Sequence, residues 1–122
     1  MSVTTCMTVL NCPDPRALAS FYEQVLSWRR IDDDESWTSL GPSPEDERLG
    51  FQRAPDFIPP SWPENPGTLQ THTDLYVDDI AAEHERVTSL GANLIDGSHE
   101  NFRVYSDPAG HLFCLCIPPS ER

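Results

Sequence analysis

The first half of the chain begins with an alternating segment, followed by a segment with helical periodicity. Residues 5–12 alternate in the way that is typical of a strand. Asp14 is a suitable helix N-cap, and Pro15 suits the first helical position because that position needs no backbone N–H donor. Apolar side chains then recur three and four residues apart, which predicts an amphipathic helix: Leu18, Phe21, Tyr22, Val25 and Leu26.

Three shorter strand-like segments follow the helix, at residues 28–31, 37–40 and 48–53. The first two are separated by the acidic run at 32–35, and a turn-rich Gly-Pro-Ser-Pro segment at 41–44 precedes the third. The first half therefore predicts one strand, one helix and three strands.

The second half repeats this plan. A strand is predicted at 69–77. A helix is predicted to begin after Asp79, to cover residues 80–90 and to end at Gly91. Three short strands are predicted to follow this helix, at 93–96, 102–106 and 112–117. Met7 and His72 stand equally far before the two helix caps. The apolar pair Tyr22/Val87 keeps the same offset but Leu18/Glu83 does not, so the repeat is one of pattern rather than of identity.

A proline-rich segment separates the two halves. Residues 54–67 read APDFIPPSWPENPG and contain five prolines, which neither a helix nor a central strand tolerates. The segment therefore predicts an extended connector between a first module at 3–53 and a second at 68–118. The fold class expected from this order is α+β, in a single domain of two βαβββ modules.

Charge narrows the range of partners. Twenty acidic residues against eight basic ones give a net charge of −12, which repels a phosphate backbone and argues against nucleic-acid binding. No segment approaches the ~20 apolar residues that a membrane span needs. The N-terminus shows no secretory pattern, so a cytoplasmic location is expected. The acidic charge has two interpretations, a solubilising surface or a cavity that attracts a cationic ligand.

The four cysteines predict no disulfide framework. Cys6, Cys12, Cys114 and Cys116 form no CxxC pair, and the chain is not loop-rich enough for a disulfide scaffold. Reduced thiols that serve as small apolar side chains are the expected state.

Four stretches, taken in order, resemble the vicinal oxygen chelate superfamily, and more narrowly its glyoxalase-like and bleomycin-resistance branch. They are VLNCPDPRALASFYEQVL, LGFQRAPDFIPPSWPENP, HTDLYVDDIAAEHERVTSLGA and YSDPAGHLFCLCIP. The resemblance implies two modules that curl their mixed sheets around a cleft for a ligand or metal, and it implies a homodimer. It does not fix the function, because the superfamily includes isomerases, dioxygenases, antibiotic-modifying enzymes and drug-sequestering proteins.

The superfamily's metal positions correspond to Met7, Gln52, His72 and Cys114. Strand alternation places each of these side chains on the face turned to the expected cleft, away from the helix side. Divalent ions of the superfamily's usual kind prefer carboxylate and imidazole donors, and only His72 is a standard ligand here. The sequence therefore predicts no cofactor and a degenerate metal site, with a divalent ion or a soft ion such as Cu(I) as the alternative.

Other side chains are candidates for a ligand pocket. His72 and Asp74 project from one strand face, either as an acid–base pair or as a hydrogen-bonded pair left where a metal once bound. Arg103 is a candidate partner for an anionic ligand group or for a surface carboxylate. His84, His99 and His111 are expected at the surface. Aromatic side chains are candidates for the cleft wall: Trp37, Trp62, Tyr76, Phe102 and Tyr105.

Two functions are consistent with these residues. The first is metal-independent binding of a small organic ligand, such as a drug or metabolite, in the cleft of a dimer. The alternative is an enzyme of lyase, isomerase or dioxygenase type, with His72 and Asp74 as catalytic candidates and with or without a divalent metal.

Overall fold

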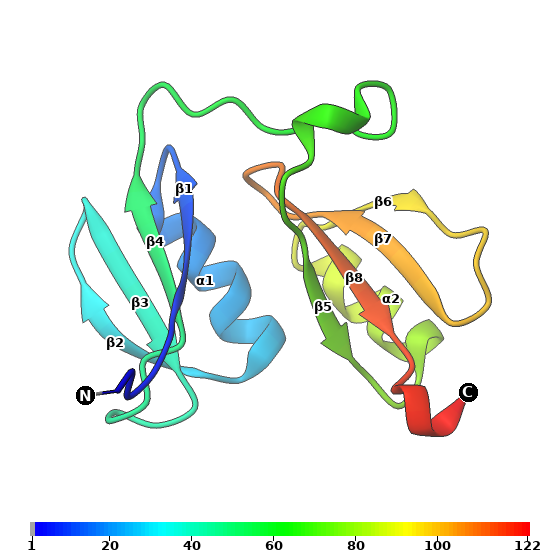
Figure 1. Ribbon diagram of the computed structural model, residues 1–122, viewed down its shortest axis with the longest axis horizontal. Coiled ribbons are helices and arrows are strands. Elements are labelled where there is room, and N and C mark those ends of the chain that lie inside the picture. The colour runs from blue at the N-terminus through cyan, green and yellow to red at the C-terminus, as the bar shows by residue number, and fades with distance from the viewer. Residues whose placement is uncertain (1) are drawn as a thin grey trace. The chain divides into compact units, whose positions relative to one another are not determined.

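The computed structural model describes residues 2–122, which form two compact units, the first ending at Phe57 and the second beginning at Ile58. Each unit consists of one strand, one helix and three further strands (Figure 1). This order confirms the predicted α+β fold of two βαβββ modules. The boundary between the units lies within the connector expected at 54–67.

The first unit has an open four-stranded mixed sheet covered by one helix. Its strands stand in the order β1-β4-β3-β2, with β1 parallel to β4 and the other neighbours antiparallel. Helix α1 packs against all four strands. The elements are β1 (Thr8–Cys12), α1 (Pro15–Leu26), β2 (Arg29–Asp33), β3 (Trp37–Gly41) and β4 (Leu49–Arg53).

Helix α1 begins and packs as its sequence predicts. The Asp14 carboxylate accepts a hydrogen bond from the Ala17 backbone N–H at 3.2 Å, which pairs one of the donors left open at a helix start. The apolar stripe of the helix is buried against the sheet, and the Tyr22 ring stacks on Phe51 with centroids 5.9 Å apart.

The second unit repeats the arrangement, with the strand order β5-β8-β7-β6 and with β5 parallel to β8. Asp79 caps the helix of this unit through the Ala82 backbone N–H, as Asp14 does in the first. Val87 of the helix is fully buried. The elements are β5 (Thr73–Tyr76), α2 (Ile80–Ser89), β6 (Asn93–Asp96), β7 (Phe102–Ser106) and β8 (Leu112–Cys116).

The first strand of each unit is shorter than the sequence pattern suggests. Strand β1 begins at Thr8 rather than at residue 5, and β5 covers only Thr73–Tyr76 of the expected 69–77. Each is an edge strand with one hydrogen-bonded neighbour, so it extends only as far as it pairs with that neighbour. The pairing of β5 runs only from Thr73 opposite Phe113 to Tyr76 opposite Cys116.

The proline-rich connector contains no strand, but it is not extended throughout as the sequence predicts, because turns form at 55–56 and 62–64 ahead of a 3₁₀ turn at Pro66–Thr68. Its apolar side chains have different environments. Trp62 packs against apolar side chains of the second sheet, whereas Ile58 is 85% exposed. Within residues 2–122 the helices are all too short or too polar to cross a membrane.

Candidate functional site

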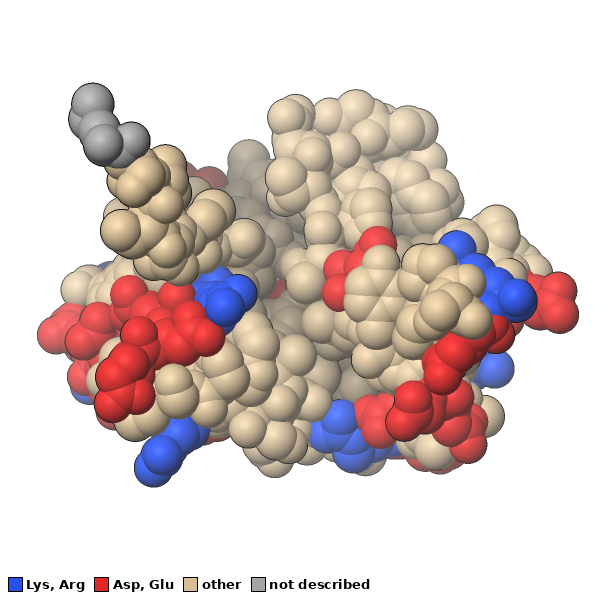
Figure 2. Space-filling model, turned by 60° about the horizontal axis from the view of Figure 1, so that its bottom comes forward, with Lys and Arg blue, Asp and Glu red and all other residues tan. Residues whose placement is uncertain are grey.

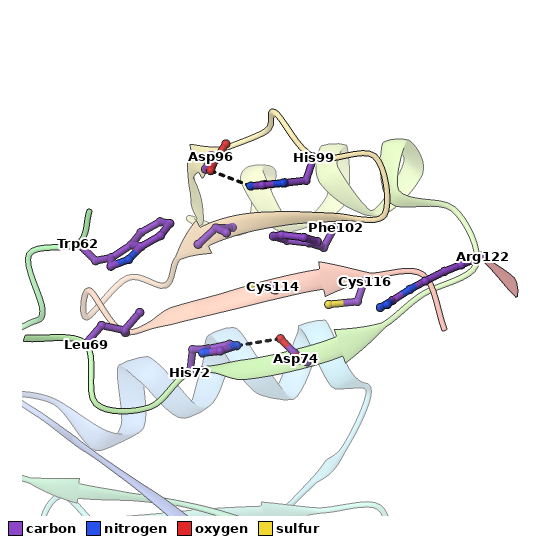
Figure 3. Close-up of a pocket in the computed structure, with 11 residues that line it drawn as sticks. Trp62, Leu69, His72, Asp74, Asp96, His99, Phe102, Cys114, Cys116 and Arg122 are labelled. Atoms are coloured by element: carbon purple, nitrogen blue, oxygen red, sulfur yellow. Dashed lines mark ion pairs between the residues drawn. The ribbon is translucent and has the colours of Figure 1, made fainter. Parts of the chain in front are cut away.

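A pocket of about 420 Å³ lies on one face of the second sheet (Figure 3). Its floor comes from alternate residues of β7 and β8, where Phe102 stands opposite Cys116 and Val104 opposite Cys114. Because side chains alternate across a strand, the intervening residues of both strands face α2 instead. Trp62, from the connector, packs against this apolar floor and forms part of the wall.

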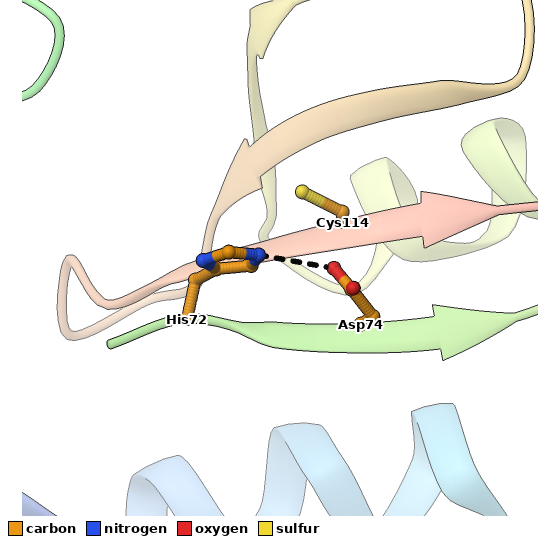
Figure 4. Close-up of side chains that lie close together, drawn as sticks. All are labelled: His72, Asp74 and Cys114. Atoms are coloured by element: carbon orange, nitrogen blue, oxygen red, sulfur yellow. Dashed lines mark ion pairs between the residues drawn. The ribbon is translucent and has the colours of Figure 1, made fainter.

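The β5 side of the pocket carries an imidazole and a carboxylate. His72 Nε2 lies 3.2 Å from Asp74 Oδ1, and the two side chains are 47% and 42% exposed. They are two residues apart along the same edge of the sheet, so both point to the same face (Figure 4). One ligand atom from each, together with the Cys114 sulfur, lies within 4.8 Å of the other two.

The two cysteines of the floor are held as thiols. Burial, followed by the negative charge of Asp74, raises the pKa of Cys114 to about 12. The same two causes raise the pKa of Cys116 to about 11. A thiolate is the reactive form of cysteine, so neither side chain is an activated nucleophile at neutral pH.

The β6 side carries a second carboxylate and imidazole. Asp96 accepts hydrogen bonds from the Ser98 hydroxyl and backbone N–H, which lower the pKa of the Asp96 carboxyl and keep it ionised. His99 Nε2 lies 3.3 Å from Asp96 Oδ2. The His99 ring stacks on Phe102, with centroids 4.2 Å apart and an interplanar angle of 15°. The pocket is thus flanked by two imidazole–carboxylate pairs from different strands (Figure 3).

Carboxylates outnumber Lys and Arg side chains both in the pocket and in the whole sequence. Asp74 and Asp96 line the pocket with one cation, Arg122, whose Nε also donates to the Ile117 carbonyl oxygen at 3.1 Å. Figure 2 shows acidic side chains gathered in several clusters, with fewer basic ones among them. Carboxylates thus occur both on the outer surface and in the pocket. The net charge is therefore compatible with a solubilising surface and with a cavity that attracts a cation.

The structure places several predicted site residues along the pocket and leaves others elsewhere. Trp62, His72, Asp74 and Cys114 line it, as does Phe102. Tyr76 lies on β5 two residues after Asp74, but it is 58% exposed and lies outside the lining.

Three further candidates, Met7, Trp37 and Gln52, belong to the first unit, so their part in a shared site stays a prediction. The Trp37 ring lies over Gly50 of strand β4, where a larger residue would meet it. Its indole N–H donates a hydrogen bond to the Asp32 carboxylate at 3.3 Å.

Two of the predicted residues, Arg103 and Tyr105, lie outside this pocket. Tyr105 is fully buried, with its ring stacked on Phe113 and its hydroxyl 2.8 Å from His84 Nδ1 of helix α2. Arg103 shares that side of β7, outside the pocket lining. Because Phe102 and Val104 occupy the pocket face, alternation places both Arg103 and Tyr105 on the opposite face. The contact with Tyr105 also makes His84 half-buried rather than a free surface residue.

Sequence reasoning missed the β6 side of the pocket. The sequence predicts His99 at the surface and does not single out Asp96; His99 is exposed, as predicted, but it lines the pocket together with Asp96. The available signal was the Asp96-Gly97-Ser98 sequence, a typical turn that reverses the chain and brings His99 back over Phe102. Leu69, Val104 and Arg122 also line the pocket without having been predicted.

Comparisons with known proteins agree with this architecture. The model of the glyoxalase-like domain family matches residues 7–116, so the chain belongs to that family. No curated protein matches the sequence.

Solved structures share the fold at low identity. One is the fosfomycin resistance protein FosX from Mesorhizobium loti, with 16% identity, a TM-score of 0.72, and coverage of 100% of this chain and 98% of that one. Another is the bleomycin-binding protein from Streptomyces verticillus complexed with copper(II)-bleomycin, with 17% identity, a TM-score of 0.59, and coverage of 97% and 99%. Such likeness shows the fold alone.

The four residues that the sequence predicts at the superfamily's metal positions have donor groups that do not fit the usual divalent ion. Cys114 is a buried thiol where a carboxylate would be expected, and its raised pKa means that it offers no anionic donor by itself. Met7 and Gln52 supply a thioether and a neutral amide, both weak ligands for hard or borderline ions. The carboxylate nearest to His72 is Asp74, which is not one of these positions.

Proposed function

We propose that this chain binds a small, flat organic ligand that carries positive charge, in the pocket of its second unit, and that it does so without the superfamily's divalent metal. The observation that carries the proposal is the composition of the pocket. Aromatic and apolar side chains form its floor and wall, while Asp74 and Asp96 line it from different strands. Pockets for small molecules commonly combine an apolar lining with a few placed polar groups.

Aromatic rings favour a flat ligand. Phe102 and His99 already stack in parallel on one side, and Trp62 supplies a further ring surface. Such faces attract cations as well as aromatic groups. The two carboxylates outnumber the single guanidinium of Arg122, so the charge balance favours a cation over an anion.

The likeness to a bleomycin-binding protein is compatible with sequestration, the first function expected from the sequence. Sequestration requires only tight binding, and the pocket thiols, held protonated, supply no nucleophile. The proposed role is therefore to hold a ligand rather than to transform it.

A panel built on one ring system tests this proposal. We expect 9-aminoacridine, a flat cation, to raise the melting temperature, because binding to the folded state stabilises it. The matched anion acridine-9-carboxylate is expected to have little effect. Asp74→Asn and Asp96→Asn should each weaken binding of the cation, whereas Asp56→Asn, in the connector, should not. Equal shifts with the two acridines, or no shift with either and with a wider panel of aromatic amines, would contradict the proposal.

The spacing of His72 and Asp74 favours a second candidate, an enzyme that uses His72 as a general base oriented by Asp74. The 3.2 Å contact between Nε2 and Oδ1 is within the range for such orientation. Once a substrate is found, His72→Ala should then abolish turnover while leaving ligand affinity within a few-fold of the original. Unchanged turnover would remove this candidate.

A further inference from the structure

The two carboxylates of the pocket stand at opposite edges of the second sheet. The strand order is β5-β8-β7-β6, and Asp74 belongs to the first of these strands while Asp96 belongs to the last. Three strand spacings of ~4.8 Å therefore separate the two residues, which is roughly 14 Å along the sheet. Figure 3 shows Phe102 and Cys116 of the floor between them. The pocket thus has two separate carboxylates rather than one acidic cluster.

Each carboxylate is held at its own edge by a different neighbour. Asp74 Oδ1 lies 3.2 Å from His72 Nε2. On the other edge, Asp96 Oδ2 lies 3.3 Å from His99 Nε2, while Asp96 Oδ1 accepts two hydrogen bonds from Ser98. The Asp74 and Asp96 side chains are 42% and 30% exposed. Water and salt screen partly buried charges less than fully exposed ones, so each carboxylate can attract its own cation.

The floor between the two carboxylates is uncharged. Its residues come from the two inner strands, and both of its thiols stay protonated at neutral pH: Phe102, Val104, Cys114 and Cys116. The guanidinium of Arg122 acts on the Cys116 thiol together with the charge of Asp74, so it adjoins the β5 side of the pocket. A ligand that spans the pocket therefore meets a carboxylate at each end and apolar surface in the middle.

We propose that the pocket selects a dication, an elongated organic ligand with a positive group at each end and an aromatic or apolar middle. This inference rests on the ligand-binding proposal and adds the number and the spacing of the charges. One cationic end lies against Asp74 and the other against Asp96, with the middle of the ligand over Phe102. A ligand with one positive group leaves one carboxylate without a cation, and a ligand with both groups at one end reaches only one carboxylate.

Three biphenyl amines separate the number of charges from their spacing. The compound 4,4′-bis(aminomethyl)biphenyl has an ammonium group at each end, its 3,5-isomer has both on one ring, and 4-aminomethyl-4′-methylbiphenyl has one. Calorimetry with the full chain at pH 7 should show the 4,4′ compound binding at least ~10-fold more tightly than either of the others. One further charge-assisted hydrogen bond is typically worth that factor.

Variants of the two carboxylates test whether both are used. Asp74→Asn and Asp96→Asn should each lower the affinity for the 4,4′ compound by about 10-fold, to the level of the monoamine. The monoamine should lose much less in either variant, because the other carboxylate remains. Asparagine keeps an acceptor oxygen for Ser98, so Asp96→Asn retains the turn. Asp56→Asn, in the connector, is the matched control and should change neither affinity.

Each failure points to one proposal or to both. Equal affinity for the 4,4′ and 3,5 isomers, or for the 4,4′ compound and the monoamine, would overturn the selection of a dication and leave the ligand-binding proposal intact. The same holds if none of the three biphenyls binds while 9-aminoacridine does. If 9-aminoacridine and the wider amine panel also fail to bind, both proposals are wrong.

Discussion

Burial gives the pocket cysteines a chemistry different from that of exposed Cys6. Cys114 and Cys116 alternate with Phe113 and Leu115 along β8, so their sulfurs face the pocket floor and lose contact with water. Desolvation disfavours a thiolate, and the nearby Asp74 carboxylate disfavours it further. The result is a pair of small, unreactive side chains at neutral pH.

These raised pKa values predict a loss of stability at alkaline pH. Unfolded thiols lose their protons near ~8.5, but the native ones retain them to about 12 and about 11. Between these values the unfolded state binds fewer protons, so the free energy of unfolding falls as pH rises above about 9. Urea unfolding from pH 8 to 11 should show a smaller fall in Cys116→Ala than in Cys6→Ala. Equal slopes in the two variants would contradict this explanation.

Tyr105 illustrates a residue whose polar atom is satisfied inside the core. Its hydroxyl bonds to His84, and its ring stacks on Phe113. We predict that Tyr105→Phe lowers the free energy of unfolding by ~1 kcal/mol, because it leaves a half-buried imidazole nitrogen without its partner. Tyr76→Phe, at an exposed position, should change it by much less. Denaturant midpoints compare the two variants, and equal values would argue against a structural role for the Tyr105–His84 bond.

At the scale of elements, the sequence predicts both helices well because their signals are local. Asp14 with Pro15, and Asp79 with the following apolar positions, define helix starts through short-range hydrogen bonds. The ends of β1 and β5 were harder to predict because an edge strand extends only as far as its hydrogen-bonded neighbour, which lies far away in sequence.

The faces of β7 show why part of the site was not predictable. The sequence predicts both Phe102 and Tyr105 in the cleft, but they are three residues apart on one strand and therefore face opposite sides of the sheet. The strand has apolar residues on both faces, so alternation alone cannot decide which one meets α2. The position of His99 depends on the turn at Asp96–Ser98, whose side-chain hydrogen bonds the sequence suggests only as a turn pattern.

The N-cap of α2 gives a prediction at this scale. Asp79→Ala should destabilise the chain by ~1 kcal/mol, because the Ala82 backbone N–H loses its acceptor. Asp79→Asn retains an acceptor oxygen and should be nearly neutral. Asp78→Ala, one residue earlier and also exposed, serves as the control for lost charge. If Asp78→Ala costs as much as Asp79→Ala in thermal unfolding, charge rather than capping is responsible.

At the scale of the whole molecule, the family assignment covers both units, but the solved structures compared here share less than a fifth of their residues with this chain. The fold therefore does not determine which ligand the protein binds. The glyoxalase-like plan positions a pocket on a sheet face, and the side chains on that face decide what enters it. Here those side chains are aromatic rings, two carboxylates and two protonated thiols.

The resemblance also predicts a homodimer. Each sheet ends in an edge strand, and β5 presents Tyr76 with 58% exposure. Such edges carry unpaired backbone N–H and C=O groups that can pair with another chain. Light scattering after size-exclusion chromatography should give twice the 13.7 kDa mass of one chain over a range of concentrations. A single 13.7 kDa species at high concentration would contradict the dimer, and the pocket would then form within a monomer.

The central claim is that the second unit alone supplies the ligand-contacting side chains. The most direct measurement is a titration of the ¹⁵N-labelled protein with 9-aminoacridine, followed by amide chemical shifts. We predict that the perturbed amides cluster in β5, β7, β8 and the 96–99 turn, and that Phe102→Ala removes the perturbations while Trp37→Ala does not. Perturbations concentrated in β1–β4, or none at saturating ligand, would contradict the claim.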